Sequence, residues 1–211
     1  MKNNQDFIKS LAKEGSKKAL RPFKRIVSGI FVISLIYYLF IVLLIFLNSK
    51  QIFLSYLFTI DSLLMFTTGF LALITAVKLM YPDRALSYLE KLLPFFPFVG
   101  LFIYFTYVTF TYNITVLISC LMMNDVMCFI KLLAISLVPT VVGLFLLGKG
   151  FVIQRTLAGV HVILAIASFG YIVLRLFEKP IHPLQMFIWH YLPGVGLLFF
   201  GPILARYLIK E

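Results

Sequence analysis

The chain has 211 residues, of which 62% are hydrophobic and only 13% are charged, and its formal net charge is +11. A soluble domain averages about 45–50% apolar and about 25% charged residues, so this composition excludes an ordinary soluble domain. Intrinsic disorder is excluded as well, because 23 Phe and 11 Tyr supply far more apolar surface than disordered chains carry. The composition predicts a membrane protein with almost no domain outside the bilayer.

The chain begins with a basic segment, residues 1–25, that contains eight Lys or Arg residues. Phe7, Ile8 and Leu11 lie within it at roughly helical spacing, and Pro22 is expected to end this helix before the membrane. Two interpretations fit the segment. It is either an amphipathic anchor on anionic lipid or a docking helix for a cytoplasmic partner.

Six apolar runs follow, each long enough to cross a bilayer as a helix of about 20 residues. In chain order they cover residues 26–48, 53–79, 92–112, 128–147, 152–174 and 184–208. We therefore expect an all-α domain of six transmembrane helices over residues 26–208. Outer-membrane strands are not expected, because they would alternate apolar and polar residues in segments of about ten. The first run lacks a following cleavage pattern and is interpreted as a retained helix.

The basic residues predict the orientation of the spans, because cytoplasmic loops carry an excess of Lys and Arg. Eight of them lie in residues 1–25, three follow the second span, two follow the fourth, and two lie near the C-terminus. The other side of the membrane receives only four, which are Lys50, Lys131, Arg175 and Lys179. Both termini are therefore expected in the cytoplasm.

The only sizeable outer connection, about residues 113–127, leads from Cys120 past Asp125 to Cys128 with three Met residues between the cysteines. Thiolate and thioether sulfurs are soft metal ligands, and thiols outside the cytoplasm can oxidise. With His182 and His190 expected near the same face, the residues form a candidate cluster for sensing metal or oxidant. The alternative is that they fill apolar contacts at the membrane surface, since their spacing matches no standard zinc motif.

Two histidines, His161 and His190, lie in different predicted spans, as the two axial ligands of a haem would. Counted from the span ends, however, they lie roughly 12 Å apart along the membrane normal at 1.5 Å per residue. Two ligands of one haem iron must meet at nearly one level. Haem is therefore not expected, and neither is any other cofactor.

Asp61 is the only acidic residue inside a predicted span. An intramembrane carboxylate is costly to bury, which makes it a functional candidate by default. The structural alternative is a hydrogen bond to Thr59, Ser62 or a Tyr of a neighbouring helix. Elsewhere the chain has no G-x-S-x-G, H-E-x-x-H or P-loop motif, so it is not expected to be an enzyme.

Several short patterns occur in order along nearly the whole chain. The basic stretch Leu20–Arg25 precedes the first span, and the stretch Ala76–Arg84 closes the second. Further along are Cys128, Pro139, the turn Gly148–Gly150, the stretches Thr156–Gly159 and Leu176–His182, and the pair Trp189-His190. Together they resemble the six-span bacterial anti-sigma factors of the negative-regulator-of-sigma-F (NrsF) type.

The resemblance implies a multi-pass regulator in the bacterial inner membrane. Such a protein would withhold an extracytoplasmic-function-type sigma factor from RNA polymerase and release it on an external redox or metal stress. The helix around Phe7, Ile8 and Leu11 would bind the sigma factor, with help from the inner turns at Arg84 and Lys149. The expected partners are thus a sigma factor and membrane lipid, without direct contact to nucleic acid.

The main alternative is a small transporter or lipid-handling protein. That function would be favoured if Asp61, His161 and His190 lined one polar cavity.

One departure from the family concerns its cysteines. Family members often carry a second outer cysteine just after the fifth span, where this chain has Leu176–Lys179. Either Cys120 replaces it as the partner of Cys128, or the sensing chemistry has changed. Eight residues of continuous helix would separate the two cysteines by roughly 12 Å, whereas a disulfide requires Cα atoms about 4.4–6.8 Å apart. Pairing therefore requires a bend within residues 121–127.

Overall fold

The computed structural model describes residues 23–49, 58–81, 86–111, 126–148, 152, 154–177 and 183–209, and within these ranges it is helical without a strand. The helices are α2 (Phe23–Ser49), α3 (Ile60–Lys78), α4 (Tyr88–Leu92), α5 (Phe95–Thr111), α7 (Val126–Leu147), α8 (Arg155–Arg175), α9 (Pro183–Met186), the π-helix η2 (Phe187–Tyr191) and α10 (Leu192–Leu208). The expected all-α fold is confirmed.

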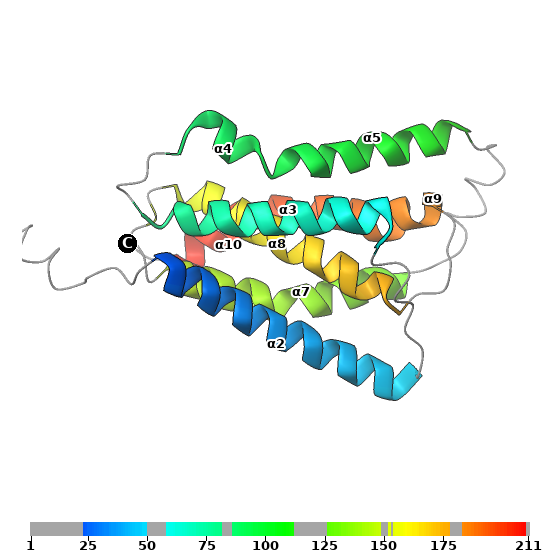
Figure 1. Cartoon of the computed structure of the whole chain (residues 1–211), viewed down its shortest axis with the longest axis horizontal. Helices are drawn as coiled ribbons and strands as arrows, with labels where there is room; N and C mark the ends of the chain where they lie inside the picture. The colour runs from blue at the N-terminus through cyan, green and yellow to red at the C-terminus, as the bar shows by residue number, and fades with distance from the viewer. Residues whose placement is uncertain are drawn as a thin grey trace, which may run out of the picture.

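The long helices lie side by side, and successive helices run in opposite directions (Figure 1). We call the end at which α8 begins the Arg155 end and the end at which it finishes the Arg175 end. α2 starts, and α3, α7 and α10 finish, at the Arg155 end, on the left of Figure 1. α8 is the central helix: it packs most extensively on α3 and α10, then on α7.

The helix bounds agree closely with the predicted spans but differ in three places. α3 begins only at Ile60, because Thr59 has an extended backbone (φ −77°, ψ 154°). The predicted third span corresponds to α5 and begins three residues later, at Phe95, because Pro94, with its ring and missing N–H, separates it from the short helix α4. The sixth run contains the π-helix directly before Pro193, which cannot donate the ordinary bond to the carbonyl of Trp189.

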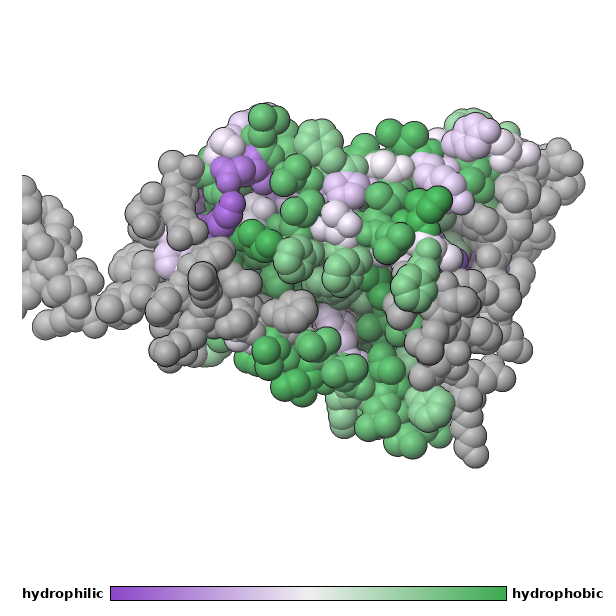
Figure 2. All heavy atoms as spheres, in the orientation of Figure 1, coloured by the Kyte–Doolittle hydropathy of each residue, from purple (hydrophilic) through white to green (hydrophobic). Residues whose placement is uncertain are grey.

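Among the described residues, four helices are long and apolar enough to cross a membrane, and they cover Ile60–Lys78, Cys128–Leu147, Arg155–Arg175 and Leu184–Leu208. Two shorter apolar stretches, Val32–Leu47 within α2 and Phe95–Thr111, which is α5, lie in the predicted first and third spans. Apolar side chains cover most of the described part of the face drawn in Figure 2. Among the most exposed are Ile36, Ile103 and Phe110, at 62%, 62% and 85%. Such a surface is typical of a membrane protein, in which lipid covers the apolar side chains.

The closest helix contact in the bundle joins α8 to α10 through two glycines. A Cβ atom placed on Gly159 would lie 2.5 Å from the carbonyl oxygen of Gly201 and would also overlap the Cβ of Ala205. A Cβ on Gly201 would in turn lie 2.9 Å from the carbonyl oxygen of Gly159. Because both obstacles are backbone, only glycine permits this approach, as small residues do at helix interfaces in membranes.

The other helices reach α8 through small residues and one long hydrogen bond. Gly69 of α3 packs on Phe169, and Gly143 of α7 packs on Val162. On the α2 side, the Tyr38 hydroxyl donates to the carbonyl of Ile166 at 3.2 Å. α7 continues through Pro139, beside an apolar cavity that lies between α2, α3, α7 and α8.

We expect Gly159→Ala to destabilise the bundle, because the added methyl group must push α10 away from α8. Overpacking of this kind costs about 1–3 kcal/mol, and thermal unfolding of the protein in detergent measures it. Gly196→Ala, on the partner helix α10, is the matched control, since a Cβ at that position meets nothing within 4 Å. Equal melting temperatures for the two variants would show that the α8–α10 contact is looser than described.

Candidate functional site

A buried ion pair lies at the Arg175 end, where α3 begins and α8 finishes. The Arg175 Nε donates to the Asp61 Oδ2 at 3.1 Å, and the two side chains are only 11% and 12% exposed. The Tyr171 hydroxyl donates to the same oxygen at 2.8 Å and is fully buried. The Arg175 Nη1 also reaches the Met186 sulfur at 3.6 Å. This cluster thus joins α3 and α8 to α9.

The cluster gives Asp61 the kind of partner that its structural interpretation predicts. The Tyr of a neighbouring helix that the sequence allowed as a partner is Tyr171, whereas the ion pair with Arg175 was missed. A signal was available, because Tyr171 and Arg175 are four residues apart and therefore share one face of a helix. The charge distribution alone places Arg175 on the outer side of the membrane and predicts no partner for it.

His190 lies next to this cluster on the π-helix. It is 1% exposed, and its ring meets the Tyr171 ring edge-on at a centroid distance of 6.3 Å. Tyr171 therefore contacts both the carboxylate of Asp61 and the ring of His190. Of the four predicted sensing residues, Cys128 is also described, and it is buried at 7% exposure in the first turn of α7.

The remaining predicted sensing residues, Cys120 and His182, lie outside the described residues, so the proximity of the four stays a prediction. Within the described ranges, no group of three or more His, Cys, Asp or Glu residues is placed to hold a metal ion.

An aromatic cluster connects the π-helix to α5. Tyr191 stacks on Phe98 at a centroid distance of 4.8 Å, and its hydroxyl donates to the Phe98 carbonyl at 2.8 Å. Phe187 meets Phe102 and Phe105 at 5.8 Å and 5.5 Å. The widened turn thus presents two aromatic rings to α5.

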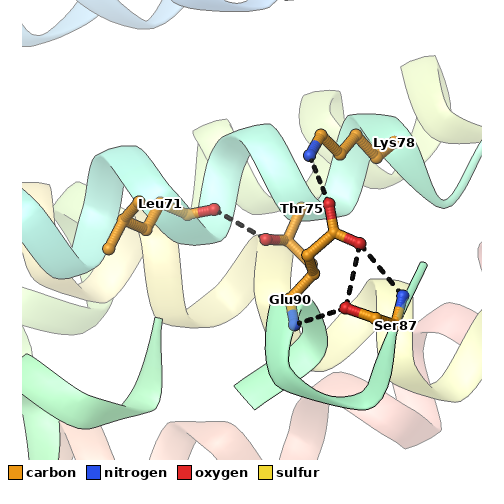
Figure 3. A network of polar contacts seen from close by, with 5 residues as sticks. All are labelled: Leu71, Thr75, Lys78, Ser87 and Glu90. Atoms are coloured by element: carbon orange, nitrogen blue, oxygen red, sulfur yellow. Dashed lines mark hydrogen bonds and ion pairs between the residues drawn. The ribbon is translucent and has the colours of Figure 1, made fainter. Parts of the chain in front are cut away.

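A network of half-buried and exposed polar groups joins the end of α3 to the start of α4 at the Arg155 end (Figure 3). The Lys78 Nζ donates to Glu90 Oε1 at 2.9 Å. Ser87 caps α4. The Ser87 hydroxyl accepts a hydrogen bond from the backbone N–H of Glu90 at 3.3 Å, and the backbone N–H of Ser87 donates to Glu90 Oε2 at 3.0 Å. The hydrogen bond from Lys78, and then those from Ser87, lower the pKa of Glu90 to about 2. Glu90 therefore stays ionised down to strongly acidic pH.

His161 fastens α4 to α8 near the same end. Its Nε2 lies 3.0 Å from the Lys91 carbonyl oxygen, and its Nδ1 lies 2.8 Å from that of Leu157. The Phe95 ring packs edge-on against the imidazole at 5.4 Å. Because both neighbours are acceptors, a neutral imidazole donates to one of them and the imidazolium to both. His161 is thus a link between helices.

The predicted sigma-binding residues Phe7, Ile8, Leu11, Arg84 and Lys149 all lie outside the described residues. The helices that lead to two of them are described. Lys78 and Glu90 flank the connection that carries Arg84, and α7 finishes at Leu147, two residues before Lys149. Both connections belong to the Arg155 end.

Comparison with known proteins gives one match. The sequence model of a family described as "Negative regulator of sigma F" (NrsF) matches residues 11–210, which is nearly the whole chain. No curated protein and no solved structure matches the chain.

We expect Asp61→Asn to destabilise the protein strongly, because it leaves the guanidinium of Arg175 buried without its counter-charge. Breaking a buried pair in this way costs about 3–5 kcal/mol, whereas Tyr171→Phe removes one hydrogen bond and costs about 1 kcal/mol. Unfolding of the two variants in detergent micelles gives the comparison. If Asp61→Asn is no worse than Tyr171→Phe, the ion pair is solvated and does not hold α3 to α8.

Proposed function

Because the chain belongs to the NrsF family of negative regulators of sigma F, we propose that it is a membrane-bound anti-sigma factor. It sequesters an extracytoplasmic-function-type sigma factor and releases it on an external redox or metal stress. The observation that carries this proposal is the family match over residues 11–210. A family of this description suggests a regulator that is not an enzyme.

In this proposal the protein crosses the bacterial inner membrane six times, with the Arg155 end in the cytoplasm. The four long apolar helices and the two shorter ones support six crossings. The orientation rests on the basic residues, of which fifteen of nineteen fall on the side of this end. Lys131, exposed on α7, and Arg175, paired with Asp61, lie toward the other end.

The sigma factor binds at the cytoplasmic end in this proposal. The N-terminal helix around Phe7, Ile8 and Leu11 supplies an apolar face for a helix-in-groove contact, and Arg84 and Lys149 supply charge beside it. The Ser87 cap of α4 and the Lys78–Glu90 ion pair support this role, because they fix the two helix ends that flank Arg84.

A signal crosses the membrane along the packed helices. α8 extends about 30 Å between its ends at 1.5 Å per residue, and α3 runs beside it over the same distance. Oxidation or metal capture at Cys128 would pull on α7, whose hydrogen bonding is weakened at Pro139. Two packings that differ by a few kcal/mol then suffice for release.

The arrangement of the buried polar residues favours the regulator over a transporter. Asp61 is engaged by Tyr171 and Arg175, whereas His161 is engaged by two backbone carbonyls. His161 and Tyr171 both lie on α8, about ten residues or roughly 15 Å apart. Asp61 and His161 thus belong to separate clusters and do not share a polar pathway.

Deletion of residues 2–20, with Pro22 to Arg25 retained, is expected to free the sigma factor and raise transcription of its targets. A reporter gene and co-purification of the sigma factor from membranes measure the two effects. The matched variant Phe7→Ser, Ile8→Ser, Leu11→Ser keeps every basic residue and is expected to act like the deletion. If a stably inserted deletion variant still represses fully, the segment is a surface anchor only.

Cys128→Ser is expected to fix repression in one state, so that oxidant or thiophilic metal no longer changes it. The reason is that the hydroxyl replaces the thiol at nearly the same volume but is neither oxidised nor a soft ligand. The reporter response to both stresses is the measurement, and Cys120→Ser shows whether the two cysteines act together. A Cys128→Ser variant that responds as the parent does would assign the signal to another site.

A further inference from the structure

A shallow cleft, wide open to its surroundings, lies at the Arg155 end between the start of α8 and the end of α10. Its volume is about 570 Å³, and it is lined by Gln154, Arg155, Thr156, Leu157, Val160 and Arg206. It includes none of the residues assigned above to sigma-factor binding or sensing.

The glycine contact between α8 and α10 brings the two arginines to one level. The helices are antiparallel, so Arg155 lies four residues from Gly159 and Arg206 lies five residues from Gly201 toward the same end. At 1.5 Å per residue, Arg155 and Arg206 lie roughly 6 Å and 7.5 Å along their helices from the contact between Gly159 and Gly201. Two guanidinium groups therefore flank one cleft at nearly equal depth.

The lining combines permanent positive charge with an apolar floor. A guanidinium is always charged and has five N–H donors in a fork that matches the oxygens of a phosphate. None of the six described lining residues is acidic, while Leu157 and Val160 are apolar and half-buried. Ile203, 52% exposed and one turn before Arg206, continues the apolar surface along α10. The ligand that fits is anionic at one end and apolar at the other.

We propose that this cleft binds the phosphate of an anionic phospholipid headgroup, with the acyl chains along Val160 and Ile203. Arg155 is the first residue of a candidate membrane span and Arg206 lies in the last turn of another, which is the level at which headgroups lie. Basic pockets between transmembrane helices at this level are suited to anionic headgroups. A free phosphate would leave the apolar floor uncovered. The inference does not depend on the sigma factor.

Native mass spectrometry of the full-length protein in detergent tests the proposal by titration with phosphatidylglycerol or with zwitterionic phosphatidylcholine. The parent is expected to bind phosphatidylglycerol more tightly. Arg155→Gln and Arg206→Gln are each expected to weaken that binding about tenfold or more, since each removes a charge-assisted hydrogen bond. Lys131→Gln is the matched control, because it removes one exposed charge from the opposite end of the bundle and is expected to bind as the parent does.

Three results would overturn the proposal. Unchanged phosphatidylglycerol binding by folded Arg206→Gln protein would place the lipid elsewhere. Because Arg206 is exposed, this variant is expected to fold, and it gives the answer even where Arg155→Gln does not fold. Equally tight binding of inorganic phosphate would make the cleft a site for a free anion. Loss of sigma-factor capture with unchanged lipid binding would make it a protein contact.

Discussion

The structure depends on the burial of α8. Because α3, α7 and α10 surround it, each polar group on this helix must find its partner inside the protein or bear the cost of an unpaired group in a low-dielectric interior. Ser168 satisfies this requirement locally, by donating to the Leu164 carbonyl at 2.7 Å. The larger groups also reach outside the helix. His161 contacts the Lys91 carbonyl as well as that of Leu157, and Arg175 donates to the carboxylate of Asp61, so each joins α8 to another part of the chain.

This requirement divides the bundle into two polar ends separated by an apolar middle. The Arg175 end holds a dehydrated ion pair, whose attraction is strong because water is excluded. The Arg155 end holds the solvated Lys78–Glu90 pair, which is 30% and 44% exposed and contributes correspondingly less. Between them, Gly159, Gly201 and Gly143 allow backbones to approach, and dispersion replaces polar contacts. Such a bundle transmits a displacement at one end as a shift of whole helices, because close-packed interiors resist local deformation.

Much of the fold could be predicted because a membrane leaves few choices. A run of about 20 apolar residues must satisfy its backbone internally, so it becomes a helix, and its bounds follow from charge and proline. The failures have local causes of the same kind. Pro94 delays the start of the third span to Phe95, and the sixth span widens into a π-helical turn shortly before Pro193. The polar partners were harder to predict. The sequence offers Asp61 two neighbours on its own stretch of chain, Thr59 and Ser62, as well as any Tyr of a neighbouring helix. Only the packing of α3 on α8 selects Tyr171 and Arg175.

Sequence by itself determined the helical class, the approximate helix ranges, the distribution of basic charge and the family, because each of these is set by the chemistry of consecutive residues. Tertiary structure decided which helix is central and which polar groups meet. The reason is that pairing across 110 or more residues, as between Asp61 and Tyr171, depends on the rotation and depth of two helices. These are fixed by side-chain packing at contacts such as Gly159 with Gly201, which no local pattern records.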